Sequence, residues 1–255
     1  MILNQAVCIV TGSAAGIGAA CAERLAVTGA RVAINYTKSE REACDVAAAC
    51  EAKGGQTILV QADVSLDADC RKLAQAVEDR WGRVDVLVNN AGTTKFVRHD
   101  DLDALQAADF QRIFGVNVIG AFQMVRAVAP VMQQQGIGAI VNVSSIAGVT
   151  GMGSSVAYAA SKGALNTMTL SLARALGPAI RVNAVCPGFV ETRWLKSGLG
   201  AEYDAKKKSY ESITPLKATV LPGDVADAVV WLLQADKVTG EIITVDSGVH
   251  LGVMR

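Results

Sequence analysis

The sequence predicts an α/β fold in which a parallel, doubly wound sheet carries helices on both faces. Short runs rich in Val, Ile and Leu alternate with longer amphipathic stretches along the whole chain. The short runs show little polar alternation, which is typical of strands buried on both faces. Repeated strand–helix–strand units imply right-handed crossovers and therefore parallel strands. A length of 255 residues suits one large domain of this kind, and we expect residues 1–255 to form it.

Each apolar run of strand length gives one predicted strand, and there are about seven: 6–12, 31–36, 56–62, 84–90, 138–145, 180–188 and 240–248. The amphipathic stretches between them predict helices at 17–28, 40–53, 66–80, 107–135, 156–177 and 223–234. One long irregular segment, 188–222, follows a strand end, which is where ligands of such sheets are usually covered. We therefore expect 188–222 to cover a substrate.

The composition excludes several classes of function. Lys plus Arg and Asp plus Glu both number 24, so the chain has zero formal net charge and lacks the basic excess of a nucleic-acid binder. The six cysteines form no C-x-x-C pair and only two histidines are present, which disfavours a metal site and suits reduced thiols in the cytoplasm. The first residues, "MILNQAVCIVTG", run directly into a strand, so we expect no signal peptide. We also expect that no apolar run is long enough to span a bilayer, and hence no membrane partner.

Three glycines connect the first strand to the first helix in "TGSAAGIG" (11–18). Any tight strand-to-helix turn favours glycine, but three glycines at the end of the first buried strand favour a dinucleotide site. Gly12 permits the tight turn, Gly16 lets a pyrophosphate approach the backbone, and Gly18 permits close packing of helix on strand. The helix N-terminus adds N–H donors and a partial positive charge. The predicted single domain is therefore Rossmann-like.

This turn and a series of further motifs resemble those of the short-chain dehydrogenase/reductase family. The further motifs are "ADVS" (62–65), "NNAG" (89–92), "NVIG" (117–120), "VSS" (143–145), "YAASK" (158–162) and "PGFVET" (187–192). The last helix and strand match as well, so the resemblance covers essentially the whole chain. The branch it resembles contains 3-oxoacyl-[acyl-carrier-protein] reductases and glucose dehydrogenases. The resemblance implies an oxidoreductase that transfers a hydride between a nicotinamide and a carbonyl or secondary alcohol.

The resemblance also implies four catalytic residues. Alone, Tyr158 and Lys162 would more often be an ordinary helix face, but the accompanying motifs favour catalysis. Tyr158 would be the general acid and base, Lys162 would also hydrogen-bond the nicotinamide ribose, and Ser145 would hold the substrate oxygen. Asn117 would hold a water that links Lys162 to solvent. Ser144 is the other candidate serine, but the thirteen-residue offset to the tyrosine favours Ser145.

The proposed acid and base needs a suitable pKa. A free phenol has a pKa near ~10, which is too high for an effective base at neutral pH. We expect the positive charge of Lys162 to lower the pKa of Tyr158, by a few units at most.

The family register also assigns residues to the cofactor. They are Gly12, Ser13, Gly16, Ile17, Gly18, Tyr36, Thr37, Lys38, Asp63, Val64, Asn90, Ala91, Gly92, Tyr158, Lys162, Gly188, Val190 and Thr192. Tyr36 stands where an Asp would contact the ribose of NAD, and Thr37, Lys38 and Ser39 can donate to a phosphate. This favours NADP. The turn "GSAAG" lacks a basic residue, so NAD stays the alternative.

The substrate is less readable. Segment 188–222 contains Phe189, Trp194, Tyr203 and Tyr210, which predict an aromatic-lined pocket if they point inward. A 3-oxoacyl group on an acyl-carrier protein is one alternative substrate. The stretch "PVMQQQGIGAI" carries no Lys or Arg to dock an acidic carrier, which weakens that alternative. A non-catalytic, cofactor-binding regulator on the same fold is a second alternative, disfavoured because all four catalytic residue types are present.

We expect a homotetramer that takes a small-molecule ketone or alcohol. The resemblance implies pairing through the long helices 107–135 and 156–177 and through the last helix and strand. Both long helices are apolar on more than one side, which calls for a second cover beyond their own sheet. The C-terminal "VHLGVMR" would then lie near a subunit boundary.

Overall fold

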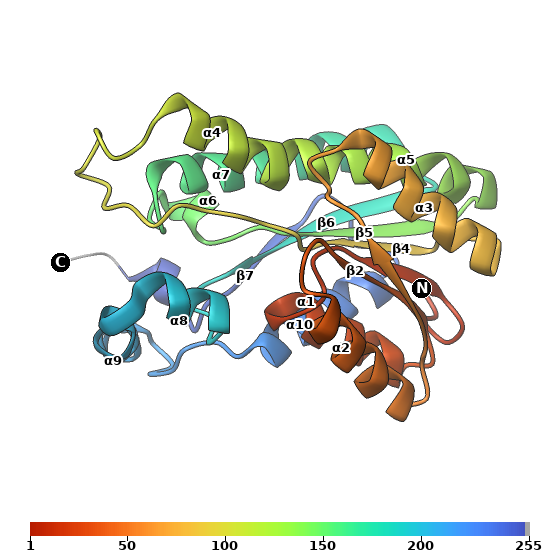
Figure 1. The fold of residues 1–255 in the computed structure, drawn as a ribbon, viewed down its shortest axis with the longest axis horizontal. Coiled ribbons are helices and arrows are strands. Elements are labelled where there is room, and N and C mark those ends of the chain that lie inside the picture. The colour runs from red at the N-terminus through yellow and green to blue at the C-terminus, as the bar shows by residue number, and fades with distance from the viewer. Residues whose placement is uncertain (253–255) are drawn as a thin grey trace.

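A computed structural model describes residues 1–252, and within them seven parallel strands form one sheet between two layers of helices (Figure 1). The strand order is β3-β2-β1-β4-β5-β6-β7. The strands are β1 (Val7–Val10), β2 (Arg31–Tyr36), β3 (Gln56–Gln61), β4 (Val86–Asn89), β5 (Gly138–Val143), β6 (Ile180–Pro187) and β7 (Ile242–Val245). The predicted doubly wound parallel sheet is confirmed. The order reverses at β1 and β4, and this switch point is where such sheets bind ligands.

Helices cover both faces of the sheet. They are α1 (Gly16–Val27), α2 (Glu40–Ala52), α3 (Asp67–Trp81), α4 (Ala107–Phe114), α5 (Ala121–Gln135), α6 (Ala147–Thr150), α7 (Val156–Leu176), α8 (Arg193–Leu199), α9 (Tyr203–Ile213) and α10 (Pro222–Gln234). One buried cluster joins α1, α2 and α10 to one face of the sheet, and another joins α3, α5 and α7 to the other face. Figure 1 shows the two layers below and above the strands.

The predicted helix 107–135 is interrupted at a functional position. Between α4 and α5 the chain forms a π-helical turn, Gly115–Gly120. Such wide turns often occur at functional sites, and this one carries Asn117. It also brings Gly120 against the loop after β3, because a Cβ on Gly120 would lie 2.9 Å from the carbonyl oxygen of Val64.

The expectation that no apolar run could span a bilayer is wrong by length and hydropathy alone. The stretch Ala107–Gln135 has 29 residues and a mean hydropathy of 1.4 in its most apolar window. Half of that window is buried inside the chain, where Met124, Val128 and Met132 pack with residues of the sheet. Core helices of soluble proteins pass the same test.

The segment 188–222 is more regular than predicted. It contains α8, a short 3₁₀ turn (Gly200–Glu202) and α9. Phe189 packs against Tyr203 and Tyr210, with ring centroids 5.6 and 5.3 Å away. These three rings therefore form the interior of the segment and hold α9 to the end of β6. Trp194, by contrast, is about half exposed.

Candidate active site

Both the backbone conformation and the close packing of the turn 11–18 call for glycine. Gly12 and Gly16 have φ angles of +61° and +59°, which favour glycine. A Cβ on Gly18 would lie 2.4 Å from Nδ2 of Asn90, so no side chain fits there. The N-cap residue of α1 is Ala15, which gives no side-chain cap. The first N–H groups of α1 are therefore left for an anion, and the turn fits a dinucleotide pyrophosphate.

Asn35 supports this turn, and the sequence reasoning missed it. Its buried Oδ1 accepts from the backbone N–H of Gly12 at 3.0 Å, and its Nδ2 donates to the carbonyl oxygen of Ala62 at 3.0 Å. Ser13 is fully buried; its hydroxyl donates to Val10 and accepts from the N–H of Asn35. The Ser13 side chain thus braces the turn rather than facing a ligand. A polar Asn inside the apolar run "RVAINY" was the available signal.

The predicted residues after β4 are tied to the same turn. The hydroxyl oxygen of Thr11 accepts from the backbone N–H groups of Asn90 and Ala91, both at 3.0 Å. The Asn90 amide donates to the carbonyl oxygens of Thr11 and Gly12 at 2.9 and 3.0 Å. The ends of β1 and β4 are therefore held together at the switch point of the sheet.

The end of β2 lies where the adenosine ribose of a dinucleotide would bind. Partial burial and then a hydrogen bond with Glu40 raise the pKa of Tyr36. The carboxylate of Glu40 therefore stands beside Tyr36. The family register would place a ribose-binding acid at position 36 itself, four residues earlier. Thr37 and Lys38 are exposed. In the part of the chain that the structure describes, Lys38 and Arg41 form no ion pair.

Asp63 and Val64 follow β3 and have structural partners. Oδ1 of Asp63 accepts from both the N–H and the hydroxyl of Ser65, at 2.9 and 2.7 Å. The carbonyl oxygen of Val64 accepts from the Gln123 amide at 3.0 Å. This loop is thereby fixed to α5.

The loop after β6 reaches the glycine turn. Gly188 has no room for a side chain, because a Cβ there would lie 2.7 Å from Cβ of Asp246. Val190 is buried, and Thr192 caps α8 by accepting from the N–H of Leu195 at 3.2 Å. A Cβ on Gly16 would lie 3.4 Å from the Thr192 methyl group. Ile17, also predicted at the cofactor, is half-buried against the core beneath α1.

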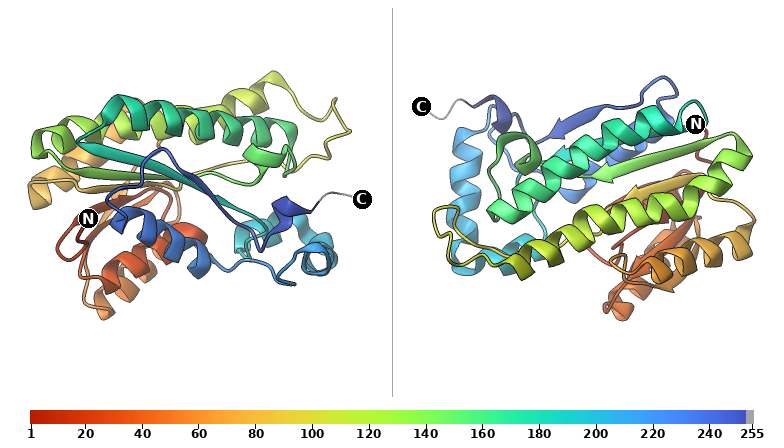
Figure 2. Two further views of the ribbon diagram at one scale, coloured as in Figure 1. Left: turned by 180° about the vertical axis from the view of Figure 1, so that it is seen from behind. Right: turned by 90° about the horizontal axis from the view of Figure 1, so that it is seen from above.

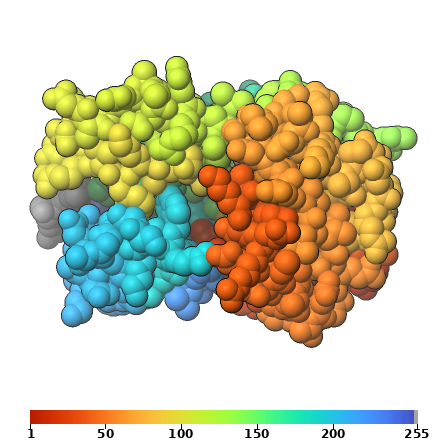
Figure 3. Space-filling view, viewed as in Figure 1, coloured from red at the N-terminus to blue at the C-terminus, as the bar shows by residue number. Residues whose placement is uncertain are grey.

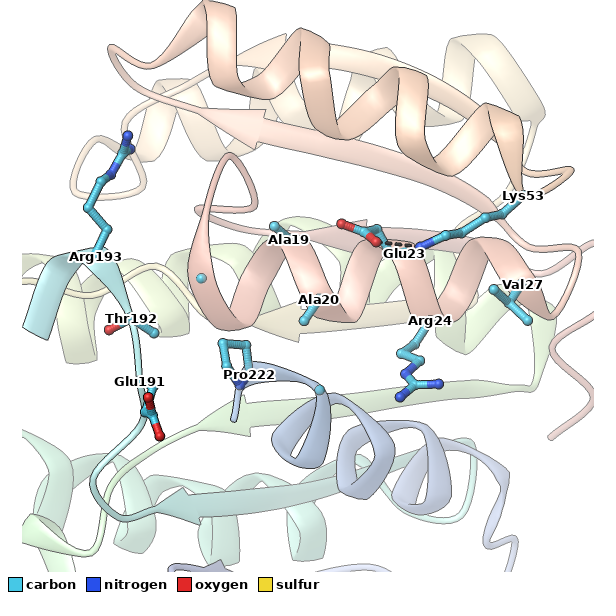
Figure 4. A pocket seen from close by; sticks show the side chains of 12 residues that line it. Ala19, Ala20, Glu23, Arg24, Val27, Lys53, Glu191, Thr192, Arg193 and Pro222 are labelled. Carbon is cyan, nitrogen blue, oxygen red and sulfur yellow. Dashed lines mark hydrogen bonds and ion pairs between the residues drawn. The ribbon is translucent and has the colours of Figure 1, made fainter. Parts of the chain in front are cut away.

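A groove of about 660 Å³ runs along α1 (Figure 4), and Gly16 and Thr192 are among the residues that line it. Glu23 and Lys53 form an ion pair across the groove. None of the four predicted catalytic residues lines it. The groove therefore adjoins the glycine turn and not the four predicted catalytic residues.

Tyr158 and Lys162 lie together near the start of α7. Ser155 caps this helix and accepts from the N–H of Tyr158 at 3.3 Å. Nζ of Lys162 is buried, donates to the carbonyl oxygen of Val143 at 2.8 Å, and lies 5.7 Å from the centroid of the Tyr158 ring. The two side chains thus face the carboxyl end of β5.

Asn117 reaches the same place from the π turn. Its side chain accepts from the N–H of Thr93 at 2.8 Å and donates to the carbonyl oxygen of Thr93 and the hydroxyl of Ser161, both at 3.0 Å. A Cβ on Gly92 would lie 3.5 Å from Oδ1 of Asn117 and 3.8 Å from Nζ of Lys162. Gly92 therefore leaves a narrow space between these two polar groups.

The two candidate serines have different surroundings. Ser144 is buried and its hydroxyl donates to the carbonyl oxygen of Lys162 at 3.1 Å, so it holds α7 in place. Ser145 is partly exposed and accepts from the N–H of Ala147 at 3.1 Å, and its hydroxyl acts to lower the pKa of Tyr158. The structure thus brings Ser145, Tyr158, Lys162 and Asn117 to one end of the sheet.

The expected lowering of the Tyr158 pKa does not occur in the cofactor-free chain. Burial raises the pKa of Tyr158 to about 12, although the hydrogen bond with Ser145 acts in the opposite direction. Burial likewise lowers the pKa of Lys162 to about 8. Desolvation, which penalises the charged form, is the largest cause of both shifts. At neutral pH the phenol is therefore a proton donor.

The described residues contain no group of three His, Cys, Asp or Glu side chains placed to hold a metal ion. The six cysteines are free thiols; Cys44 is exposed and the others are buried.

Comparison with known proteins finds relatives that match nearly the whole chain. Residues 12–250 match a family model described as enoyl-(acyl carrier protein) reductase. The chain is 43% identical to the candidate ketoacyl reductase 2 of the granaticin polyketide synthase from Streptomyces violaceoruber, over 96% of each protein. It is 35% identical to a 3-oxoacyl-[acyl-carrier-protein] reductase of Synechocystis sp., over 96% of this chain and 97% of that protein.

A solved structure is equally similar. The crystal structure of a candidate short-chain dehydrogenase/reductase from Burkholderia xenovorans matches with a TM-score of 0.90 and 42% identity, over 97% of this chain and 99% of that one. Related sequences, fold and motifs agree along the whole chain. The chain therefore belongs to the short-chain dehydrogenase/reductase family and is an oxidoreductase of ketones and alcohols.

Proposed function

We propose that this chain is an NADP(H)-preferring ketone reductase in which Tyr158 protonates the product oxygen. A bound reduced nicotinamide would supply the hydride. As the hydride adds to the carbonyl carbon, the carbonyl oxygen takes up the electron pair and then the phenol proton of Tyr158. Ser145, whose hydroxyl acts on the pKa of Tyr158, would hold that oxygen and steady its developing charge. The observation that carries the proposal is a partly buried phenol with a raised pKa, beside a serine hydroxyl and a buried ammonium.

The raised pKa of Tyr158 favours the direction of reduction. A phenol that keeps its proton at neutral pH is ready to donate it, whereas oxidation of an alcohol needs the phenolate. Lys162 would stabilise the phenolate left after donation.

After Tyr158 has given up its proton, Asn117 would help to return one from solvent. Its side-chain amide is already bonded to Thr93 and Ser161, so it fixes the π turn. A water in the space beside Gly92 would bond to this turn and link Lys162 to solvent, as a proton relay requires. The narrow gap between Asn117 and Lys162 supports this part of the proposal.

Replacing Tyr158 tests the mechanism. Tyr158→Phe removes the proton and keeps the ring, so turnover of a ketone should fall at least ~100-fold, the lower end of acid–base contributions. Cofactor affinity, measured by calorimetry, should stay close to wild type. Tyr203→Phe, which removes a hydroxyl from the interior of the covering segment, is the matched control and should keep turnover within about twofold. Near-normal turnover by Tyr158→Phe would refute the mechanism.

The cofactor preference rests on the surroundings of Tyr36. Lys38 and Arg41 are exposed next to it, and neither has an ion-pair partner in residues 1–252. Both can approach a 2′-phosphate. Glu40 beside Tyr36 acts in the other direction, since a carboxylate repels that phosphate and accepts from a 2′-hydroxyl. Lys38 and Arg41, which lack ion-pair partners within residues 1–252, outnumber the single carboxylate of Glu40. This balance of charge favours NADP.

We expect NADPH to bind more tightly than NADH in calorimetric titrations. Arg41→Ala should weaken NADPH binding about tenfold, the scale of one charge-assisted hydrogen bond, and change NADH binding much less. Tyr36→Asp should shift preference towards NADH. Lys208→Ala, an exposed lysine on α9, is the control and should change neither affinity. Tighter binding of NADH by the wild-type protein would contradict this assignment.

A free ketone is favoured over a substrate on a carrier protein. On α9, Lys206 is paired with Glu202 at 2.8 Å and Lys207 with Glu191 at 2.7 Å, whereas Lys208 forms no ion pair within residues 1–252. An acidic carrier would need an open basic rim. Reduction of 3-oxoacyl groups on a carrier is the second candidate, because relatives are named for that activity.

We further propose a homotetramer in the cytoplasm, where free thiols persist. Helices α4–α5 and α7 lie side by side on the outside of one layer (Figure 2). They expose Ile119, Phe122 and Leu170 by 52, 43 and 46%. A two-fold interface would cover this apolar face. The expected place of "VHLGVMR" falls partly on residues 253–255, which lie outside the described residues.

Light scattering at micromolar concentration should show a species of about four times the 26.5 kDa chain mass. Phe122→Asp should shift the protein to smaller species, because a charge would be buried in the interface. Val27→Asp, on the exposed surface of α1, should not. A clean 26.5 kDa wild-type species would be incompatible with the proposal.

A further inference from the structure

Three aromatic rings from distant segments lie in a row at the proposed catalytic tyrosine. They are Phe96, Trp194 and Tyr158 itself, and we call them the aromatic wall. Building on the proposed function, we propose that the aromatic wall selects ketones carried on flat, apolar ring systems and rejects polyhydroxylated substrates.

Trp194 is the centre of the aromatic wall. Its ring centroid lies 5.5 Å from that of Phe96 and 6.3 Å from that of Tyr158, with interplanar angles of 57° and 46°. Such tilted pairs are favourable aromatic geometries. Trp194 is nonetheless 47% exposed, so part of its indole surface is left uncovered. The Trp194 ring itself lies next to the phenol that would protonate the substrate.

Phe96 is held by contact with α8. A Cβ on Gly198 would lie 2.0 Å from the Phe96 ring, so the ring rests directly on the helix backbone. Figure 3 shows the yellow surface that contains the loop after β4 against the cyan surface of α8, with a hollow beside them. Gly198 thus permits a contact between the Phe96 ring and the backbone of α8 that a side chain at position 198 would prevent.

The loop that carries Phe96 is also fixed from its other side. The backbone N–H of Val97 donates to the carbonyl oxygen of Ser154 at 2.8 Å, and the hydroxyls of Thr94 and Ser154 are 2.7 Å apart. Residue 154 directly precedes the N-cap of α7. The loop is thus tied to the helix that carries Tyr158, and the aromatic wall is pre-formed.

The polar groups of this loop are already bonded within the protein. Thr94 is paired with Ser154, and Thr93 accepts from Arg112 at 2.9 Å. Lys95 is bonded to Asp109 at 2.7 Å. A polyol would need to break these bonds or leave its hydroxyls unpaired, which is costly in a desolvated site. An apolar ring needs no such partner and can stack on the open indole surface.

The ratio of catalytic efficiencies towards two ketones tests this proposal. We would measure kcat/KM for 1-tetralone, a flat bicyclic ketone, and for 2-butanone, with NADPH and with NADH. The wild-type protein should favour 1-tetralone. Trp194→Leu keeps apolar bulk without the ring and should lower the ratio about tenfold, and Trp194→Phe should restore most of it. L-rhamnose with either oxidised cofactor should be a poor substrate.

Two further variants separate stacking from general damage. Gly198→Ala must displace Phe96 and should lower the ratio without touching Trp194. Trp231→Ala removes an indole of similar exposure, 52%, on α10 and should leave the ratio unchanged. A ratio unaltered by both Trp194→Leu and Gly198→Ala, or a wild-type preference for 2-butanone or L-rhamnose, would overturn the proposal. Turnover of no ketone with either cofactor would instead refute the proposed function.

Discussion

The burial of the Lys162 ammonium is the constraint on which the candidate active site depends. Within residues 1–252 this ammonium has no carboxylate partner, and its bond to the carbonyl oxygen of Val143 fixes it at the end of β5. The helix can dock this closely because a Cβ on Gly148 would lie 2.5 Å from the carbonyl carbon of Lys162. Ser144 adds a hydrogen bond to the same peptide. These contacts therefore fix the sheet, α6 and α7 relative to one another around Lys162.

This constraint also determines the electrostatics of the site. Desolvation raises the pKa of Tyr158 and lowers the pKa of Lys162, so both groups favour their neutral forms. A neutral phenol suits proton donation to a product oxygen. A positively charged nicotinamide, present after hydride transfer, would act in the opposite direction and favour the phenolate. The protonation state of the tyrosine would then follow the redox state of the cofactor.

The sequence predicted the parts of the site that depend on spacing within one segment. The glycines of the first turn and the Tyr158–Lys162 pair lie within single strand–turn–helix or helical units, so their local geometry follows from the chain. The π turn around Asn117 was missed, because an apolar helical pattern continues across it without interruption. Asn35 and Phe96 were also missed. Their roles depend on contacts with Gly12 and Gly198, which are distant in sequence, and no local periodicity reports such contacts.

In the absence of cofactor, burial raises the pKa of Tyr158 and keeps the phenol protonated. The most direct test is a spectrophotometric pH titration of tyrosinate in the cofactor-free protein, taken as the difference between wild type and Tyr158→Phe. The account predicts no Tyr158 tyrosinate below the ordinary tyrosine pKa of about 10, since burial raises the pKa of this phenol to about 12. A Tyr158-dependent signal that titrates near neutral pH without cofactor would contradict it.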